Sequence, residues 1–267
     1  MKSKKTSRSE RISSLLLVVF SGILVVSLVV LGRYFWASHK NSEQYENLRS
    51  AVKQTPSSAV ADAGSESDSS SAASSDSEPA APVIDFDALH EINPDIIGWI
   101  YIEGTKIDYP ILQTDDNDFY LHHDYMGKSS ANGSIFADFR NEAPFSDRNT
   151  VLYGHNMKNG QMFHDLLAYQ QQSFFDEHPV AHIYTPEGEY QIAFLCGTTE
   201  NGAQEFVSFD FTTDEDFVDY VNAFRRRSTF QSDVVLEDDD RIVTLSTCSY
   251  VRDNARFALI GRIVPQD

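Results

Sequence analysis

One cysteine in this chain ends an apolar, β-prone run. Arg241 to Cys248 reads Arg-Ile-Val-Thr-Leu-Ser-Thr-Cys, which is typical of a buried strand, and a similar run begins at Arg256 and ends at Val264. If these runs pair as antiparallel strands, Cys248 and Arg256 face each other across the loop between them. A thiol attacks a carbonyl as its thiolate, and a neighbouring guanidinium favours that thiolate or steadies an oxyanion. The pattern predicts a nucleophile with an arginine beside it.

A proton carrier for this chemistry is predicted at another strand end. The short apolar run Asn149 to Tyr153 leads into Gly154-His155, so the imidazole lies at a strand terminus and not inside a packed face. In that place His155 can protonate a departing amine and later deprotonate an incoming one.

Two further side chains share a face with these groups. Residues two apart in a strand point the same way, so Ser246 accompanies Cys248 and Tyr153 accompanies His155 as candidate substrate contacts. For Ser246 the alternative is simple strand polarity. Arg252 is the rival of Arg256, but an arginine that begins a strand holds a more fixed direction than one in mid-loop.

These motifs resemble a known family. Thr-Leu-Ser-Thr-Cys ending at Cys248, the arginine eight positions later and the Tyr-Gly-His-Asn around His155 look like a sortase, a cysteine transpeptidase of Gram-positive surfaces. The stretch that begins Asn93-Pro-Asp-Ile-Ile-Gly-Trp-Ile resembles the amino-terminal part of class B sortases. The carboxyl end shows no second apolar span of the kind expected in a class C enzyme. The resemblance covers residues 84 to 267.

The resemblance implies a fold, an activity and partners. The expected fold is mainly β, a closed eight-stranded barrel with helical insertions. The expected activity is cleavage of a C-terminal sorting signal through a thioester on Cys248, with His155 as acid and base and Arg256 at the oxyanion. The acyl group then passes to an amine of a peptidoglycan precursor or a pilin lysine. Two alternatives stay open: a secreted cysteine peptidase that only hydrolyses, and a tethered binding domain without catalysis.

Composition limits the partners. The formal net charge is −19, and residues 1 to 40 carry seven Lys and Arg against one acid, which leaves 14 basic against 39 acidic residues in the rest. Such an acidic body argues against a nucleic-acid partner.

No metal-ligand spacing, P-loop or dinucleotide fingerprint is present, so no cofactor or metal is expected. His122 and His123 are adjacent, so their side chains diverge and do not form a metal site. Of the two cysteines, Cys196 is interpreted as a buried thiol and Cys248 as a reactive one. The alternative is a single disulfide between them.

The chain divides into four predicted parts. Residues 1–11 form a basic cytoplasmic tail, and residues 12–36 a transmembrane anchor whose run 12–31 carries no charge. The positive-inside rule then gives a single-pass type II protein of the cell membrane with its catalytic domain outside; a cleaved signal peptide is the alternative. Residues 37–82 read as a low-complexity extracellular linker rich in Ser, Ala and Asp. Residues 83–267 form the catalytic domain.

Periodicity within that domain predicts many short strands and few helices, as in a barrel. A short helix is expected around Phe86 to Ile92 and another from 161 to 169. The most clearly signalled helix begins at Asp214, where Thr213 and Asp216 have capping-box spacing. Strands are predicted at 96–102, 107–112, 133–137, 149–153, 180–184, 190–196, 241–248 and 256–264.

Overall fold

The computed structural model describes residues 8–54, 83–142, 144–249 and 254–264, without the side chains of 8–15, 18, 34–38, 54, 248 and 249. The chain falls into two units, residues 1–51 and 52–267, which are described separately. The predicted basic tail lies outside the described residues over 1–7, and the predicted linker does so over 55–82.

The first unit is formed by helix α1 (Arg8–Val52), which reaches Val52 at the border of the second unit. Its large apolar side chains between Leu16 and Leu31 are 50–68 % exposed. Within the described residues, no helix meets the combined length and hydropathy expected of a membrane span. The anchor over residues 12–36 therefore stays a prediction.

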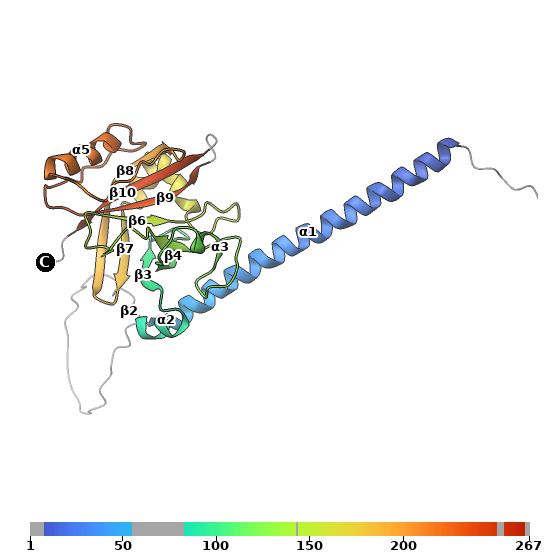
Figure 1. Cartoon of the computed structure of the whole chain (residues 1–267), viewed down its shortest axis with the longest axis horizontal. Helices are drawn as coiled ribbons and strands as arrows, with labels where there is room; N and C mark the ends of the chain where they lie inside the picture. Colours follow the sequence, from blue (N-terminus) through green and yellow to red (C-terminus); the bar gives the residue numbers. More distant parts are fainter. Residues whose placement is uncertain (1–7, 55–82, 143, 250–253, 265–267) are drawn as a thin grey trace, which may run out of the picture. The chain divides into compact units, whose positions relative to one another are not determined.

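The second unit is a closed β-barrel (Figure 1). Its eight strands are β3 (Ile96–Tyr101), β4 (Asp108–Leu112), β5 (Ile135–Ala137), β6 (Asn149–Tyr153), β7 (Val180–Thr185), β8 (Gly188–Asn201), β9 (Ile242–Ser249) and β10 (Ala255–Val264). Their order around the barrel is β10-β8-β7-β3-β4-β5-β6-β9. Pairing is antiparallel except between β4 and β5 and between β6 and β9. The prediction of a closed eight-stranded barrel is confirmed.

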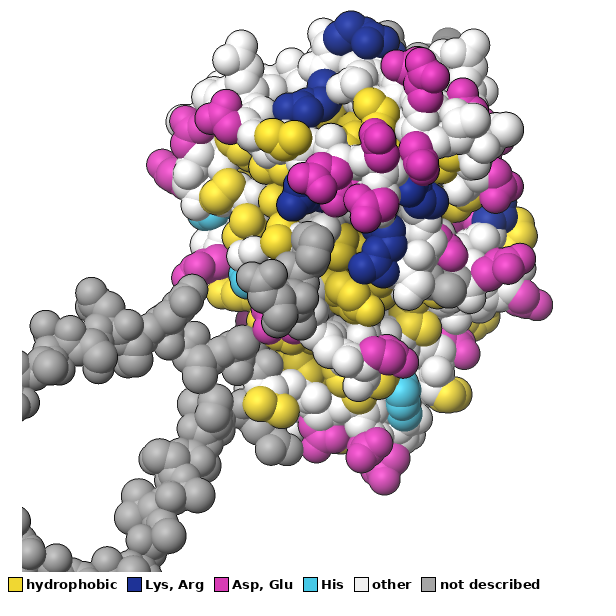
Figure 2. All heavy atoms as spheres, turned by 90° about the vertical axis from the view of Figure 1, so that its left-hand side faces the viewer, with side chains coloured by type: hydrophobic (Ala, Val, Ile, Leu, Met, Phe, Trp, Pro, Cys, Tyr) yellow, Lys and Arg dark blue, Asp and Glu magenta, His cyan; other side chains and the backbone are white. Residues whose placement is uncertain are grey.

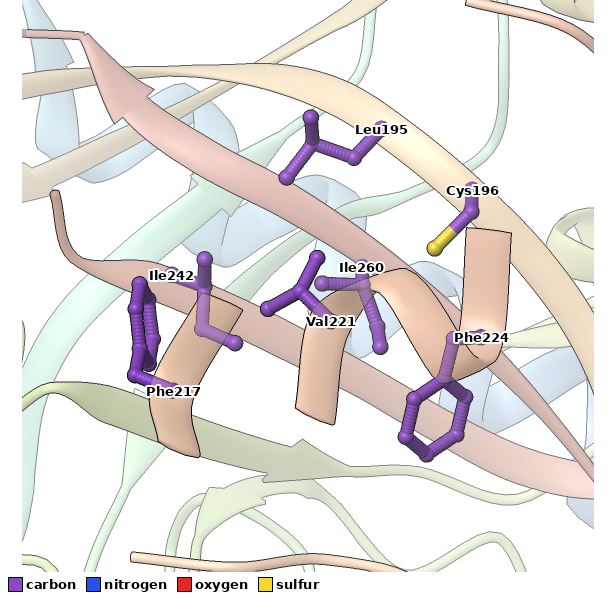
Figure 3. Packing of buried hydrophobic residues seen from close by; sticks show 7 residues of the cluster. All are labelled: Leu195, Cys196, Phe217, Val221, Phe224, Ile242 and Ile260. Atoms are coloured by element: carbon purple, nitrogen blue, oxygen red, sulfur yellow. The ribbon is translucent and has the colours of Figure 1, made fainter. Parts of the chain in front are cut away.

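Helix α5 (Asp214–Arg225) covers one side of this barrel. It begins with the predicted capping box, since the Thr213 side chain accepts from the Asp216 amide and the Asp216 carboxylate accepts from the Thr213 amide. Its apolar face meets side chains of β8, β9 and β10 (Figure 3). We call this group the α5 cluster: Leu195, Cys196, Phe217, Val221, Phe224, Ile242 and Ile260.

The barrel unit also contains short elements that interrupt the strands. Helix α2 (Phe86–Ile92) lies where it was predicted, and the side chain of Asp85 caps it. The helix expected at 161–169 is the 3₁₀ helix η1 (His164–Gln170). Helices α3 (Phe119–His122) and α4 (Gln172–Glu177) were not predicted, because four and six residues are too short to show helical periodicity. Strand β8 is longer than predicted because it pairs with both β7 and β10.

A small second sheet brings Lys53 to the barrel. Strand β1 (Lys53–Gln54) pairs antiparallel with β2 (Val83–Ile84). The Lys53 ammonium lies 2.6 and 2.7 Å from the two carboxylate oxygens of Asp108, which also accepts from the Trp99 indole at 2.6 Å. The second unit thus begins at Val52, before the predicted domain start at 83.

Figure 2 shows one face of the molecule with Asp and Glu side chains spread widely and Lys and Arg in fewer places. This distribution matches the acidic body expected from composition and gives no continuous basic surface on that face.

Candidate active site

A cleft of about 350 Å³ opens where β6, β9 and β10 lie side by side. Nine residues line it: Asn117, Leu121, Phe136, Tyr153, Gly154, His155, Ser246, Thr247 and Arg256. Four of the five residues predicted for the site, namely Tyr153, His155, Ser246 and Arg256, are therefore brought together. Tyr153 and His155 lie at and just after the end of β6, whereas Ser246 and Arg256 lie on the consecutive strands β9 and β10.

The glycine before the histidine is required by packing. A Cβ at Gly154 would lie 2.4 Å from Ile135 Cδ1 and 2.7 Å from Phe163 Cδ2. Hydrogen bonds tie this corner to β9, because the Gly154 amide donates to Ser246 O at 3.2 Å and the Thr247 hydroxyl donates to Gly154 O at 2.7 Å. The backbone that leads into His155 is thus held closely against the barrel.

The imidazole of His155 is oriented by a backbone carbonyl. Its Nε2 lies 2.8 Å from Leu121 O. A carbonyl oxygen only accepts hydrogen bonds, so Nε2 carries the hydrogen in the neutral ring. This leaves Nδ1 as the nitrogen that takes up or releases a proton.

Cys248 and Arg256 have the register expected from the sequence. They are paired across β9 and β10, as are Ser246 and Ala258 two residues further along the strands. The side chain of Cys248 lies outside the described residues, as does all of Arg252. Paired residues share a face of the sheet, so the Cys248 position lies on the face that presents Ser246 and Arg256 to the cleft.

Glu200 continues this row on the other side of Arg256. The two residues are paired across β8 and β10. The Glu200 side chain accepts from the Thr198 hydroxyl at 2.7 Å and forms an ion pair with Arg227 at 3.1 Å. Arg227, two residues after the end of α5, therefore pairs with a mostly buried carboxylate.

Tyr153 connects the cleft to a buried carboxylate. Its hydroxyl donates to Asp138 Oδ2 at 2.8 Å, and Arg140 also donates to this fully buried carboxylate. Burial alone raises the pKa of Asp138, but the hydrogen bonds from Arg140 and Tyr153 outweigh it and hold the pKa below its ordinary value. Burial, followed by the Asp138 charge, raises the pKa of the Tyr153 phenol. Tyr153 is therefore a neutral donor at the cleft wall.

The other cysteine lies in a different environment. Cys196 is a free, fully buried thiol in the α5 cluster, so it forms no disulfide. Burial raises the pKa of this thiol to about 12. It therefore stays protonated at neutral pH and is a poor nucleophile.

Several cleft residues were not found from the sequence. The Leu121 carbonyl is a backbone group that no side-chain motif signals. Asn117 comes from the loop before α3, and its Oδ1 accepts from the Phe139 amide at 3.0 Å. Asp138 and Arg140 form a buried ion pair beside the cleft. The sequence signal for it is two opposite charges spaced two residues apart directly after a strand.

Comparisons with known proteins agree with this geometry. A sortase domain family model matches residues 100–264. Sortase B of Listeria monocytogenes is 39% identical over 178 residues, which cover 66% of this chain and 72% of that protein. The Staphylococcus aureus sortase B–substrate complex superposes with a TM-score of 0.64 at 35% identity, covering 68% of this chain and 85% of that one. A sortase B complexed with triglycine gives the same TM-score and identity, covering 68% of this chain and 86% of that one.

The family follows from the cleft and these matches together. The match to the sortase domain spans more than half of the chain, and a relative well above 30% identity is covered over more than two thirds of its length. The chain belongs to the sortase family of cysteine transpeptidases and is most like class B.

Proposed function

We propose that this protein is a membrane-anchored transpeptidase that cleaves a C-terminal sorting signal of surface proteins and joins the new carboxyl end to an amine. The observation that carries the proposal is the register that pairs Cys248 with Arg256 beside the cleft that contains His155. The amine belongs to a peptidoglycan precursor or to a pilin lysine. The complexes of similar proteins with a substrate and with triglycine support a peptide donor and an amine acceptor.

The first half of the reaction forms a thioester. The Cys248 thiolate attacks the scissile carbonyl carbon, and the carbonyl π electrons move to its oxygen. Arg256 stabilises that oxyanion through its guanidinium. When the tetrahedral intermediate collapses, the C–N bond breaks and the departing amine takes the proton from His155 Nδ1. The hydrogen bond from Nε2 to the Leu121 carbonyl orients the ring while Nδ1 transfers this proton.

The second half transfers the acyl group. Neutral His155 accepts a proton at Nδ1 from the incoming neutral amine as the nitrogen lone pair of that amine attacks the thioester carbonyl. The C–S bond then breaks and Cys248 leaves as thiolate. Ser246 and Tyr153 line the same cleft and are proposed to contact the peptide, with Tyr153 presenting its ring because its hydroxyl is already donated to Asp138.

Membrane attachment is proposed for residues 12–36. The apolar side chains from Leu16 to Leu31 are at least half exposed along α1, and such an uncovered apolar stretch is stabilised by lipid. The basic residues before it place the amino terminus in the cytoplasm and the catalytic domain outside the cell.

The test is mass spectrometry of the full chain in detergent micelles with candidate sorting peptides and an oligoglycine or diamine. A peptide joined to the amine, absent with Cys248→Ala, is the expected result. Cleavage with no joined product would instead indicate a hydrolase. No reaction with any peptide, together with a Cys248 that resists alkylation in the folded protein, would favour the non-catalytic binding domain.

A further inference from the structure

The turn that follows β5 contains a dense hydrogen-bond network next to the cleft. Both oxygens of the fully buried Asp138 accept from the Arg140 guanidinium, from Nε at 2.9 Å and from Nη2 at 2.8 Å. The Tyr153 hydroxyl and the Arg140 amide also donate to this carboxylate. A buried carboxylate is costly unless it is paired, so this two-pronged pair orders its members strongly.

Arg140 extends the network to the β8–α5 loop, which we define as residues 202–213. Its Nη1 forms an ion pair and hydrogen bond with Glu205. Its guanidinium carbon also lies 4.3 Å from the ring centroid of Phe209 in the same loop. One side chain thus connects the buried carboxylate to two points of the loop.

Gly202, the first residue of this loop, contacts Arg256, the side chain proposed to stabilise the oxyanion. The Gly202 amide donates to Asn254 O at 2.7 Å. A Cβ at Gly202 would lie 2.8 Å from Arg256 Cγ and 3.3 Å from Arg256 Nε, so the side chain of Arg256 rests directly on the Gly202 backbone. The position of the loop therefore limits where the guanidinium can lie.

Together these contacts connect two walls of the cleft, one formed by Tyr153 at the end of β6 and the other by Arg256 on β10. The connection runs from Tyr153 through Asp138, Arg140 and Glu205 to the loop, whose first residue contacts Arg256. We propose that Asp138 is a positioning residue, which sets the spacing of the two cleft walls by holding the β8–α5 loop through Arg140. This role rests on the proposed transpeptidase function of the cleft.

Replacement of Asp138 by Asn separates positioning from folding. The turn keeps its backbone hydrogen bonds, including Asp138 N to Val151 O at 2.9 Å and Asn141 N to Asp138 O at 3.0 Å. The Asn side chain has the same shape and still offers one oxygen, but it removes the charge that Arg140 pairs with. The walls should therefore lose their fixed spacing while the barrel stays folded.

The kinetic test compares three variants of the full chain in micelles. Asp138→Asn should raise the peptide KM about tenfold and Glu205→Gln about threefold, with kcat within about twofold, because wall spacing affects binding before and during reaction alike. Glu189→Gln is the matched control, since Glu189 binds His182 at 2.7 Å at the opposite end of β8. An unchanged KM in Asp138→Asn, or an equal rise in Glu189→Gln, would overturn the proposal.

Hydrogen exchange gives a readout that does not need a substrate. Amides of residues 202–213 should exchange about tenfold faster in Asp138→Asn and in Glu205→Gln than in wild type, and Glu189→Gln should match wild type. Unchanged exchange in Asp138→Asn would show that the carboxylate does not hold the loop. If wild type joins no peptide, the proposed function fails, and exchange alone decides whether Asp138 positions the loop.

Discussion

The three strands β8, β9 and β10 contribute to two different regions, the apolar α5 cluster and, a few residues away, the candidate active-site cleft. Strand β9 contributes Ile242 and β10 contributes Ile260 to the α5 cluster (Figure 3). The same strands carry Cys248, near the end of β9, and Arg256, which lines the cleft. Cys196 of β8 lies on the dry side. Four to six residues along a strand, about 13 to 20 Å, therefore separate packing from chemistry.

The two regions use different forces. In the α5 cluster seven side chains fill space without a charged group among them. At the cleft, Leu121 O, Asp138 and Glu205 hold their partners by directional hydrogen bonds and ion pairs. The cluster should therefore respond to changes in side-chain volume, and the cleft to changes in charge or in a single donor.

The two cysteines give the largest expected contrast. Cys248→Ala should lower the rate of peptide joining at least about 10³-fold, because it removes the proposed nucleophile. Cys196→Ala should leave kcat within about twofold and lower the free energy of unfolding by about 1–2 kcal/mol, because it only removes buried volume. Joining rates and denaturant unfolding measure both. A large loss of kcat in folded Cys196→Ala would remove the contrast.

Truncation of a ring in the cluster should act on stability. Phe217 is fully buried between α5 and the sheet, so Phe217→Ala should cost about 3–5 kcal/mol of unfolding free energy. The peptide KM of the molecules that remain folded should not change. Urea unfolding followed by circular dichroism measures the loss, and Val235→Ala, at an exposed position, serves as the control.

Alkaline pH should lower the free energy of unfolding through Cys196 in the α5 cluster. Its pKa is raised from 9.0 to about 12, so between these values the unfolded chain releases a proton that the folded chain retains. Stability is therefore full below pH 9 and falls as pH rises, by about 1 kcal/mol between pH 9 and 10. Wild type should show this fall in urea titrations and Cys196→Ala should show less of it. Identical slopes for the two proteins would contradict the prediction.

Acid should weaken the polar region through Asp138. The pKa of this carboxyl is lowered, so its contribution to stability is present above the ordinary value of 3.8 and is lost as pH falls through the folded value. Asp138→Asn should therefore lose less stability on acidification than wild type, as measured by thermal unfolding below pH 4. Equal losses would mean that other carboxyl groups account for the acid sensitivity.

Local pattern predicted the strands and the facing positions of Cys248 and Arg256, because strand pairs joined by a short loop leave few registers. It also predicted the start of α5, where Thr213 and Asp216 are three residues apart. The partner of His155 is 34 residues away, and that of Arg140 in the loop is 65 residues away. Such partners follow from barrel closure and leave no periodic trace in the sequence.

The pairing of β1 with β2 bears on how much reach the linker expected at residues 37–82 would give the barrel. Gln54 and Val83 are partners in one antiparallel pair, so the chain departs and returns at neighbouring points. Residues 55–82 then add no contour length between the proposed anchor and the barrel, however many residues they include. A shorter or longer insert at 55–82 should therefore leave that contour length unchanged.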